Sequence, residues 1–184
     1  MILDSKMSLR EKYRKQVIPA MKEKFGYRND LAAPKIEKVV INTGVGGTIK
    51  DEKALEEITK SLTLIAGQKL TSRRAKKAIS AFKIREGMVV GLAVTLRGKR
   101  MYDFLERLVS IALPRGRDFR GLSQKSIDKS GNLTIGIKEQ IIFPEVSAES
   151  AKNIFGFEIC VKTTAKTKEE GLELLRLLGF PIKL

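Results

Sequence analysis

The side chains of this sequence that could do chemistry are mainly cations, and the residue types present exclude most catalytic and metal sites. Histidine is absent, and Cys160 is the single cysteine. The commonest general base and the commonest metal ligand are therefore missing, and a zinc site built from cysteine and histidine cannot form. No pair of Asp and Glu residues stands out from ordinary helix surface charge. We expect no enzymatic activity, no metal and no cofactor.

The densest group of charges is a basic segment without clear periodicity, between residues 69 and 87. Its main cations are Arg73, Arg74, Lys76, Lys77, Lys83 and Arg85. Cations this close repel one another unless an anion binds among them. Charge runs are often only solvated surfaces, but in a chain with a net charge of +15 we favour an RNA contact. A second predicted loop, residues 114–132, carries Arg115, Arg117 and Arg120.

A glycine-rich turn, Gly44–Val45–Gly46–Gly47, precedes a predicted helix and could cradle a phosphate. It is not a nucleotide P-loop, because Thr48 stands where that motif requires Gly-Lys-Ser/Thr. It matches the GXXG of KH domains, but that loop joins two helices and this one follows a strand. We favour a tight turn that needs positive φ over a phosphate site.

The overall composition indicates one globular domain, residues 1–184, that binds a polyanion. A pI of about 10.0 favours nucleic acid as the partner and leaves an anionic membrane second. No apolar run is long enough to span a bilayer, and the N-terminus lacks the order of a signal peptide. Translation could start at Met1 or at Met7.

The hydrophobic periodicity predicts an α+β fold, with a mainly antiparallel sheet, helices packed on one face and the opposite face open for RNA. Capping signals and apolar stripes predict helices, and β-branched runs predict strands. The predicted helices cover about 9–25, 51–66, 98–112 and 167–179, and the predicted strands cover 36–43, 89–97, 133–143 and 157–164. We expect Pro19 to kink the first helix and Pro114 to end the third.

Alternation in the strand 89–97 predicts two unlike sheet faces. Val90, Leu92, Val94 and Leu96 are bulky and should face the helices. The other positions are mostly small and end in a hydroxyl and a cation, Thr95 and Arg97. A face of this kind lets a polyanion approach the backbone, although an ordinary solvated face is the alternative.

The scarcity of aromatic residues indicates which kind of RNA is bound. Aromatic residues make up 6% of the chain and tryptophan is absent, and most Phe and Tyr fall on predicted apolar faces. Readers of single-stranded RNA usually stack bases on exposed aromatic side chains. We therefore expect folded RNA, recognised by its shape, phosphates and 2′-hydroxyls.

Several long motifs resemble the bacterial-type large-subunit ribosomal protein five family, in colinear order over nearly the whole chain. These motifs are residues 40–46 (VINTGVG), 66–69 (AGQK), 81–87 (AFKIREG), 94–98 (VTLRG), 113–121 (LPRGRDFRG) and 138–145 (KEQIIFPE). The resemblance implies a ribosome-bound cytoplasmic protein, or an organellar one, in the central protuberance of the large subunit. Its implied partners are 5S rRNA, 23S rRNA, P-site tRNA, neighbouring large-subunit proteins and a small-subunit head protein.

The resemblance also assigns roles to individual positions. It implies 5S rRNA contacts in the sheet and the first helix, and the matching polar positions are Asn42, Gln68 and Thr95. We add the cations Arg97, Lys15 and Arg10 as expected 5S rRNA contacts. It identifies the basic segment with the family's tRNA contact, at Arg73, Arg74, Lys76, Lys77, Lys83 and Arg85. It leaves Arg115, Arg117 and Arg120 for other rRNA, and Glu145 and Glu149 for the bridge to the small subunit.

Two other functions remain open at this point. The chain could be a free RNA chaperone or regulator that uses the same surface. It could instead lie on a membrane through its basic first helix, although that helix lacks the apolar face rich in Trp and Phe that is expected at interfaces.

Overall fold

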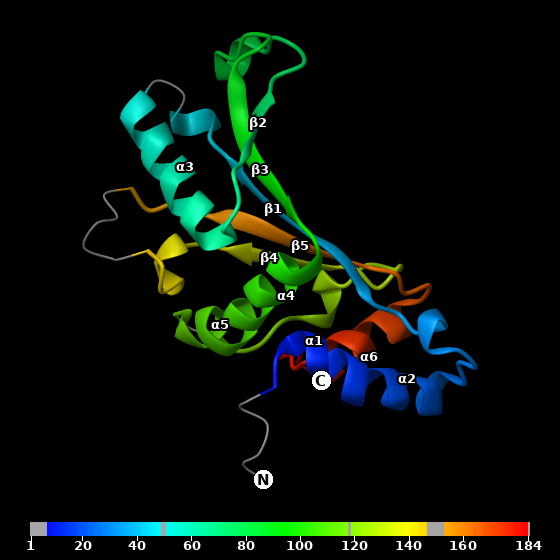
Figure 1. Cartoon of the computed structure of the whole chain (residues 1–184). Coiled ribbons are helices and arrows are strands. Elements are labelled where there is room, and N and C mark those ends of the chain that lie inside the picture. The colour runs from blue at the N-terminus through cyan, green and yellow to red at the C-terminus, as the bar shows by residue number, and fades with distance from the viewer. Residues whose placement is uncertain (1–6, 49–50, 118, 147–152, 184) are drawn as a thin grey trace. The chain divides into compact units, whose positions relative to one another are not determined.

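The computed structural model describes residues 7–48, 51–117, 119–146 and 153–183 and has an α+β fold (Figure 1). Its antiparallel sheet has five strands in the order β2-β3-β1-β5-β4. The described residues fall into two compact units, which are treated separately below. The first contains the described residues within 1–39, 97–135 and 160–184, and the second contains those within 40–96 and 136–159. The expectation of one domain stays a prediction.

The predicted elements correspond closely to those of the structure. The helices are α1 (Leu9–Lys12), α2 (Ile18–Phe25), α3 (Glu52–Ala66), α4 (Gly98–Arg107), α5 (Leu113–Arg115) and α6 (Lys168–Leu178). The strands are β1 (Ile36–Gly44), β2 (Thr71–Arg74), β3 (Val89–Leu96), β4 (Leu133–Ile137) and β5 (Phe157–Thr163). Two π-helical turns, Tyr13–Val17 and Leu108–Ala112, join α1 to α2 and α4 to α5.

Two prolines of the first unit lie inside continuous helices, each just after a π turn. Pro19 follows the turn that ends at Val17, and Pro114 follows the one that ends at Ala112. Proline has no N–H to donate, and its ring crowds the carbonyl four residues before it. A π turn widens the helix at that carbonyl. The expectation that Pro114 ends its helix is therefore wrong, since helical backbone continues to Arg115.

The first unit also packs α6 against the turn 128–132. Gly171 of α6 is buried and lies directly against the backbone of Gly131. The first turn of α6 is capped, because the Thr167 side chain accepts a hydrogen bond from the Glu170 N–H at 3.3 Å. Glu170 in turn accepts a hydrogen bond from the Tyr27 hydroxyl at 2.5 Å. These contacts fix α6 at both its first turn and its buried side.

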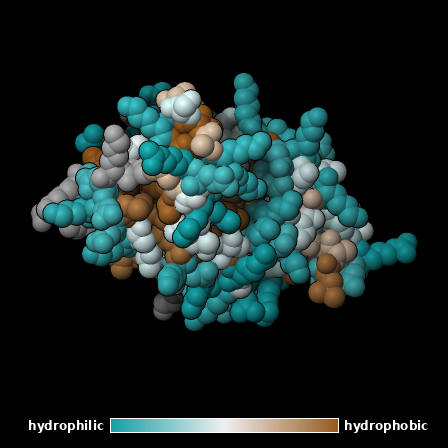
Figure 2. Space-filling model, turned by 90° about the horizontal axis from the view of Figure 1, so that it is seen from above, coloured by the Kyte–Doolittle hydropathy of each residue, from teal (hydrophilic) through white to brown (hydrophobic). Residues whose placement is uncertain are grey.

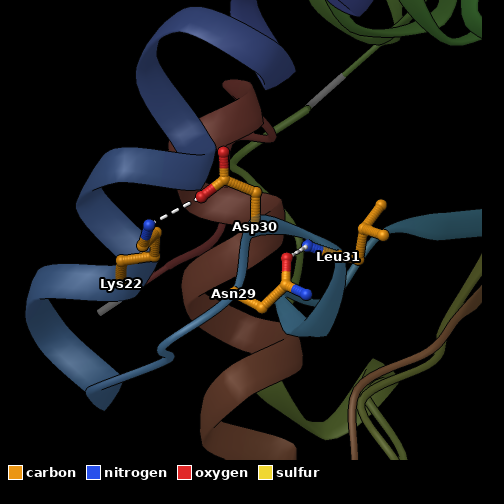
Figure 3. A network of polar contacts seen from close by, with 4 residues as sticks. All are labelled: Lys22, Asn29, Asp30 and Leu31. Carbon is orange, nitrogen blue, oxygen red and sulfur yellow. Dashed lines mark hydrogen bonds and ion pairs between the residues drawn. The ribbon is translucent and has the colours of Figure 1, made fainter.

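A short connection after α2 is held by its own polar groups (Figure 3). Lys22 of α2 forms an ion pair with Asp30, at 2.6 Å between Nζ and Oδ1. The Asn29 side chain accepts a hydrogen bond from the Leu31 N–H at 3.0 Å and caps a 3₁₀ turn over Asp30–Ala32. The Leu31 side chain points away from this network and is 87% exposed.

In the second unit, α3 has the apolar face that its sequence predicts. Ile58, Leu62 and Ile65 are buried at one helical spacing, and α3 packs on β3. The Asp51 side chain caps the first turn, and Gly67, with a φ of +64°, ends the helix. The predicted bounds of this helix are confirmed within one residue.

Two predictions about the sheet need correction. The strand expected over 133–143 ends at Ile137, and a 3₁₀ turn follows at Gln140–Ile142. The buried Gln140 side chain donates a hydrogen bond to the Asn153 carbonyl at 2.7 Å and accepts one from the Phe155 N–H at 2.9 Å. These bonds hold Gln140 against the segment 153–155, where the strand does not continue. The basic segment expected to lack periodicity contains β2, which pairs antiparallel with β3.

Candidate nucleic-acid interface

The cations of the basic segment lie on a β-hairpin in the second unit. β2 pairs with β3 so that Arg73 lies opposite Gly91 and Arg74 opposite Val89. The register shifts between the two arginines, because Val90 is an extra residue on β3. Such a bulge increases the local twist of a hairpin. The structure therefore gives both exposed arginines an ordered backbone rather than a loose loop.

The end of this hairpin, which lies beyond β2 and β3 in Figure 1, covers residues 75–88. Its backbone is itself hydrogen-bonded. The Ala75 N–H donates to the Met88 carbonyl at 2.8 Å, and Ile79 and Ile84 exchange two bonds of 2.9 and 3.1 Å. A 3₁₀ turn at 80–82 completes the tip. We call residues 75–88 the hairpin tip.

The charged side chains of the hairpin are almost all positive. Residues 69–88 contain seven cations, which are Lys69, Arg73, Arg74, Lys76, Lys77, Lys83 and Arg85, and one anion, Glu86. All eight side chains are exposed. Within the described residues, the ion pairs lie elsewhere, for example at Lys22–Asp30 and Lys24–Glu173. The hairpin therefore presents a concentrated positive charge to solvent, which suits a polyanion.

Three polar residues expected to contact RNA lie in the second unit. Asn42 and Thr95 are half-buried on β1 and β3, which neighbour each other in the sheet. Gln68 follows the end of α3, and its side-chain amide donates to the Thr95 carbonyl at 3.2 Å. Gln68 is thus connected to Thr95 within the protein itself. Asn42 lies 3.5 Å from Glu158 of β5, an acidic neighbour that the sequence did not point to.

The two-faced strand is confirmed in part. Leu92, Val94 and Leu96 are buried as expected. Ala93 is also buried, at 7% exposure, so the small-residue side of β3 is less open than predicted. A Cβ at Gly91 would lie 3.1 Å from the Thr43 carbonyl. The close approach of β1 therefore explains this glycine without any ligand.

Side chains alternate between a buried and an exposed face along the whole of β4. Leu133, Ile135 and Ile137 are buried, whereas Thr134 and Gly136 are on the opposite side and Gly136 is exposed. A Cβ at Gly136 would have no neighbour within 4 Å. The backbone is accessible at this position, as a close-approaching polyanion requires.

The remaining cations expected to contact 5S rRNA lie in the first unit. Arg97 is exposed and forms a long ion pair with Glu37, at 3.8 Å. Lys15 is exposed on the π turn before α2. Arg10 lines a cleft of about 340 Å³ between α1 and α4, together with Arg14 and Tyr102. Burial raises the pKa of Tyr102, and the two guanidinium groups oppose that shift.

The second arginine group and the acidic bridge residues lie outside the hairpin in the sequence. Arg115 ends α5, and Arg117 and Arg120 are exposed beyond it in the first unit. Glu145 is half-buried after the 3₁₀ turn of the second unit. Glu149 lies outside the described residues. The structure therefore describes four of these five residues, three in the first unit and one in the second.

The glycine-rich turn differs from its expected conformation. None of Gly44, Gly46 and Gly47 has a positive φ, and a Cβ at any of them would have no neighbour within 4 Å. The expectation of a turn that needs positive φ is wrong. The turn bends instead through a 3₁₀ helix at Gly46–Thr48.

One feature of the hairpin tip was missed from the sequence. Phe82 is 72% exposed and Ile79 is 46% exposed, although most aromatic residues were expected on apolar faces. The signal available was the position of Phe82 between Ala81 and Lys83, outside any apolar stripe. β2 was missed because all four of its residues are exposed, so its sequence carries no alternation.

The face of the molecule shown in Figure 2 is mainly hydrophilic, with small hydrophobic areas between the polar side chains.

Within the described residues, no cluster of three or more Cys, Asp and Glu side chains could hold a metal ion. No helix found in the same residues is long and apolar enough to cross a bilayer.

Comparison with known proteins gives a consistent set of similarities. Residues 29–85 match the family model for ribosomal protein L5, and residues 89–182 match the model for the C-terminus of the same ribosomal family. The chain is also similar to the large ribosomal subunit protein uL5 of Thermoanaerobacter sp. (strain X514). The two are 56% identical over 173 residues, which cover 94% of this chain and 97% of that protein.

Proposed function

Because the chain belongs to the ribosomal protein L5 family, we propose that it joins two RNAs in the large ribosomal subunit, 5S rRNA and P-site tRNA. The family membership establishes the coarser function. The protein is a non-enzymatic structural constituent of the large subunit, ribosome-bound in the cytoplasm, with rRNA and ribosomal proteins as its partners.

The observation that carries the proposal is the ordered basic hairpin. It carries seven exposed cations and one exposed anion on a paired and hydrogen-bonded backbone. An ordered backbone loses little freedom when its cationic side chains bind phosphates. The hairpin therefore suits a ligand that binds and leaves repeatedly, and we assign the tRNA contact to Arg73, Arg74, Lys76, Lys77, Lys83 and Arg85.

The proposed 5S rRNA contact uses hydrogen-bonding groups as well as charge. Asn42, Gln68 and Thr95 offer amides and a hydroxyl that suit sugars and base edges. Arg97, Lys15 and Arg10 would supply phosphate contacts. The hydrogen bond from Gln68 to the Thr95 backbone supports this assignment, because it holds a polar side chain at a fixed position beside the strand.

Two further contacts complete the proposal. The exposed Arg115, Arg117 and Arg120 would bind 23S rRNA through phosphates. Glu145, together with Glu149, would face a basic small-subunit head protein and help to form the bridge. The opposite signs of the two groups suit these opposite partners.

A multiple substitution separates the two RNA contacts. Changing Arg73, Arg74, Lys76 and Lys77 to Ala should preserve binding to isolated 5S rRNA and accelerate tRNA dissociation from assembled ribosomes. Filter binding measures the first quantity, and the release of labelled deacylated tRNA from the P site measures the second. Loss of 5S rRNA binding by a folded variant would show that the two surfaces are assigned wrongly.

Co-sedimentation tests the competing functions. A ribosomal constituent stays with large subunits at high salt, whereas a free chaperone or regulator returns to the soluble pool. Flotation with anionic vesicles tests the membrane alternative, for which we expect no stable binding.

A further inference from the structure

The hairpin tip carries two large apolar side chains that are open to solvent. Phe82 is 72% exposed and Ile79 is 46% exposed, within a segment that also carries the four cations Lys76, Lys77, Lys83 and Arg85. Exposed aromatic side chains surrounded by positive charge are typical of surfaces that stack on nucleic-acid bases. The phosphate contacts proposed above leave these two side chains without a role.

The backbone that carries Phe82 is held on both sides. Ile79 and Ile84 exchange backbone hydrogen bonds across the tip, and the Lys83 N–H donates to the Ser80 carbonyl at 3.0 Å. Lys83 has a φ of 54°, in the left-handed region that L-residues rarely adopt. This conformation closes the 3₁₀ turn directly after Phe82. The aromatic ring is therefore presented from an ordered turn, not from a free loop.

We propose that Phe82 stacks on the face of an exposed base at the surface of a folded RNA, with Ile79 packing beside it. This inference rests on the proposed tRNA contact and adds to it a recognition element other than charge. The neighbouring cations Lys77, Lys83 and Arg85 would hold the phosphates that flank that base. The excess of seven cations over one anion favours RNA over an apolar protein pocket.

Stacking and phosphate contacts contribute differently to such a complex. Phosphate contacts weaken steeply with salt because bound counterions are released on binding. Stacking has little dependence on salt or on base identity, since every base has a π-face. A tip that combines the two would bind many different tRNAs with similar affinity, as a ligand that changes at each round of translation requires.

The test measures the dissociation rate of deacylated tRNA from the P site of ribosomes that carry the full-length variant protein. Phe82→Ala should accelerate release by roughly 5- to 100-fold, the range expected for loss of one stacked base. Phe82→Trp should release tRNA no faster than the unchanged protein. Phe82→Leu should resemble Phe82→Ala, because a leucine is apolar but cannot stack.

Salt dependence distinguishes stacking from a general weakening of the hairpin. For tRNA binding, Phe82→Ala should leave the slope of log K against log salt unchanged. The variant in which Arg73, Arg74, Lys76 and Lys77 are changed to Ala, called the cation variant, should reduce this slope. Leu31→Ala is the matched control, since it truncates another exposed apolar side chain, 87% exposed, outside the hairpin. It should leave tRNA release unchanged.

The outcomes separate this inference from the function on which it rests. If the cation variant accelerates release and Phe82→Ala does not, the hairpin binds tRNA but the stacking inference is wrong. If Phe82→Leu behaves like the unchanged protein, Phe82 occupies an apolar pocket and base stacking is refuted. If neither variant changes release, the tRNA contact itself is refuted, and the inference with it.

Discussion

Glu170 is a single surface carboxylate whose ionisation is controlled by its neighbours. Partial burial opposes its charge, but hydrogen bonds from the Tyr27 hydroxyl and from two backbone N–H groups outweigh that effect. The pKa of Glu170 is therefore lower than its ordinary value. Burial and the same contact raise the pKa of Tyr27. The pair connects the end of α2 with the first turn of α6.

A Tyr27→Phe substitution tests this contact through its pH dependence. A carboxylate with a lowered pKa stabilises the fold above its unfolded pKa, and this contribution is lost as pH falls through the folded pKa. The variant should therefore unfold more easily at pH 7, and the difference should vanish in acid. Urea unfolding at several pH values measures this effect. An equal loss of stability at all pH values would contradict the role of the Glu170 charge.

Asn42 is the residue at which RNA recognition and protein stability are easiest to separate. Among the described residues, its side chain forms one hydrogen bond, a long one to Glu158, at 3.5 Å. Asn42→Ala should therefore weaken 5S rRNA binding by about 1 kcal/mol or more, while the unfolding free energy changes little. Filter binding and urea unfolding of the same sample measure the two quantities.

Asn29→Ser is the matched control for Asn42→Ala. It removes a side-chain amide elsewhere in the chain but keeps an oxygen that can cap the 3₁₀ turn. It should leave 5S rRNA binding unchanged. Equal weakening by both variants would show that Asn42 has no specific RNA contact.

At the scale of elements, the position of α6 depends on two glycines in contact. A Cβ at Gly171 would overlap the Gly131 backbone, and a Cβ at Gly131 would lie 2.8 Å from Gly171 Cα. Helix propensity favours alanine over glycine by about 1 kcal/mol in a helix interior. The overlap with rigid backbone opposes this preference, and overpacking of this kind costs about 1–3 kcal/mol or more.

We therefore expect Gly171→Ala to destabilise the protein in spite of its better helix propensity. The free energy of unfolding should fall by about 2 kcal/mol or more, and urea unfolding measures this change. Gly136→Ala is the control, because its Cβ would meet no neighbour within 4 Å and its φ is ordinary. A stabilised Gly171→Ala protein would show that α6 can shift away from the turn without cost.

At the scale of the whole molecule, the net charge of +15 is the property that most affects stability and RNA binding. Self-repulsion of this size destabilises the free folded chain, and the same charge attracts RNA. Salt screens both effects. Stability of the free protein and affinity for RNA should therefore respond to salt in opposite directions.

Two titrations of the full-length protein measure this opposition. Raising salt should increase the thermal midpoint of the free protein. Over the same range, log K for 5S rRNA should fall with log salt at a slope of roughly −3.5 to −6, as expected for about 5 to 7 phosphate contacts. A binding constant that does not depend on salt would contradict a contact based on phosphates.

Individual residues show which helices and strands could be predicted from the sequence. The buried Ile58, Leu62 and Ile65 of α3 follow a helical period, and the alternating faces of β4 follow a period of two. These patterns identified α3 and β4 because burial on one side leaves a periodic trace in the sequence. β2 is exposed on both faces and leaves no trace, so only its pairing with β3 reveals it.

The sequence by itself determined the sign of the charge, the cations that carry it, most helices and strands, and the family. These properties depend on residue types and local spacing. Only the tertiary structure decided that the basic segment is an ordered hairpin, that Ala93 is buried, and that Phe82 is exposed at the tip. The physical reason is that exposure depends on which distant segments cover a residue, and local spacing contains no record of them.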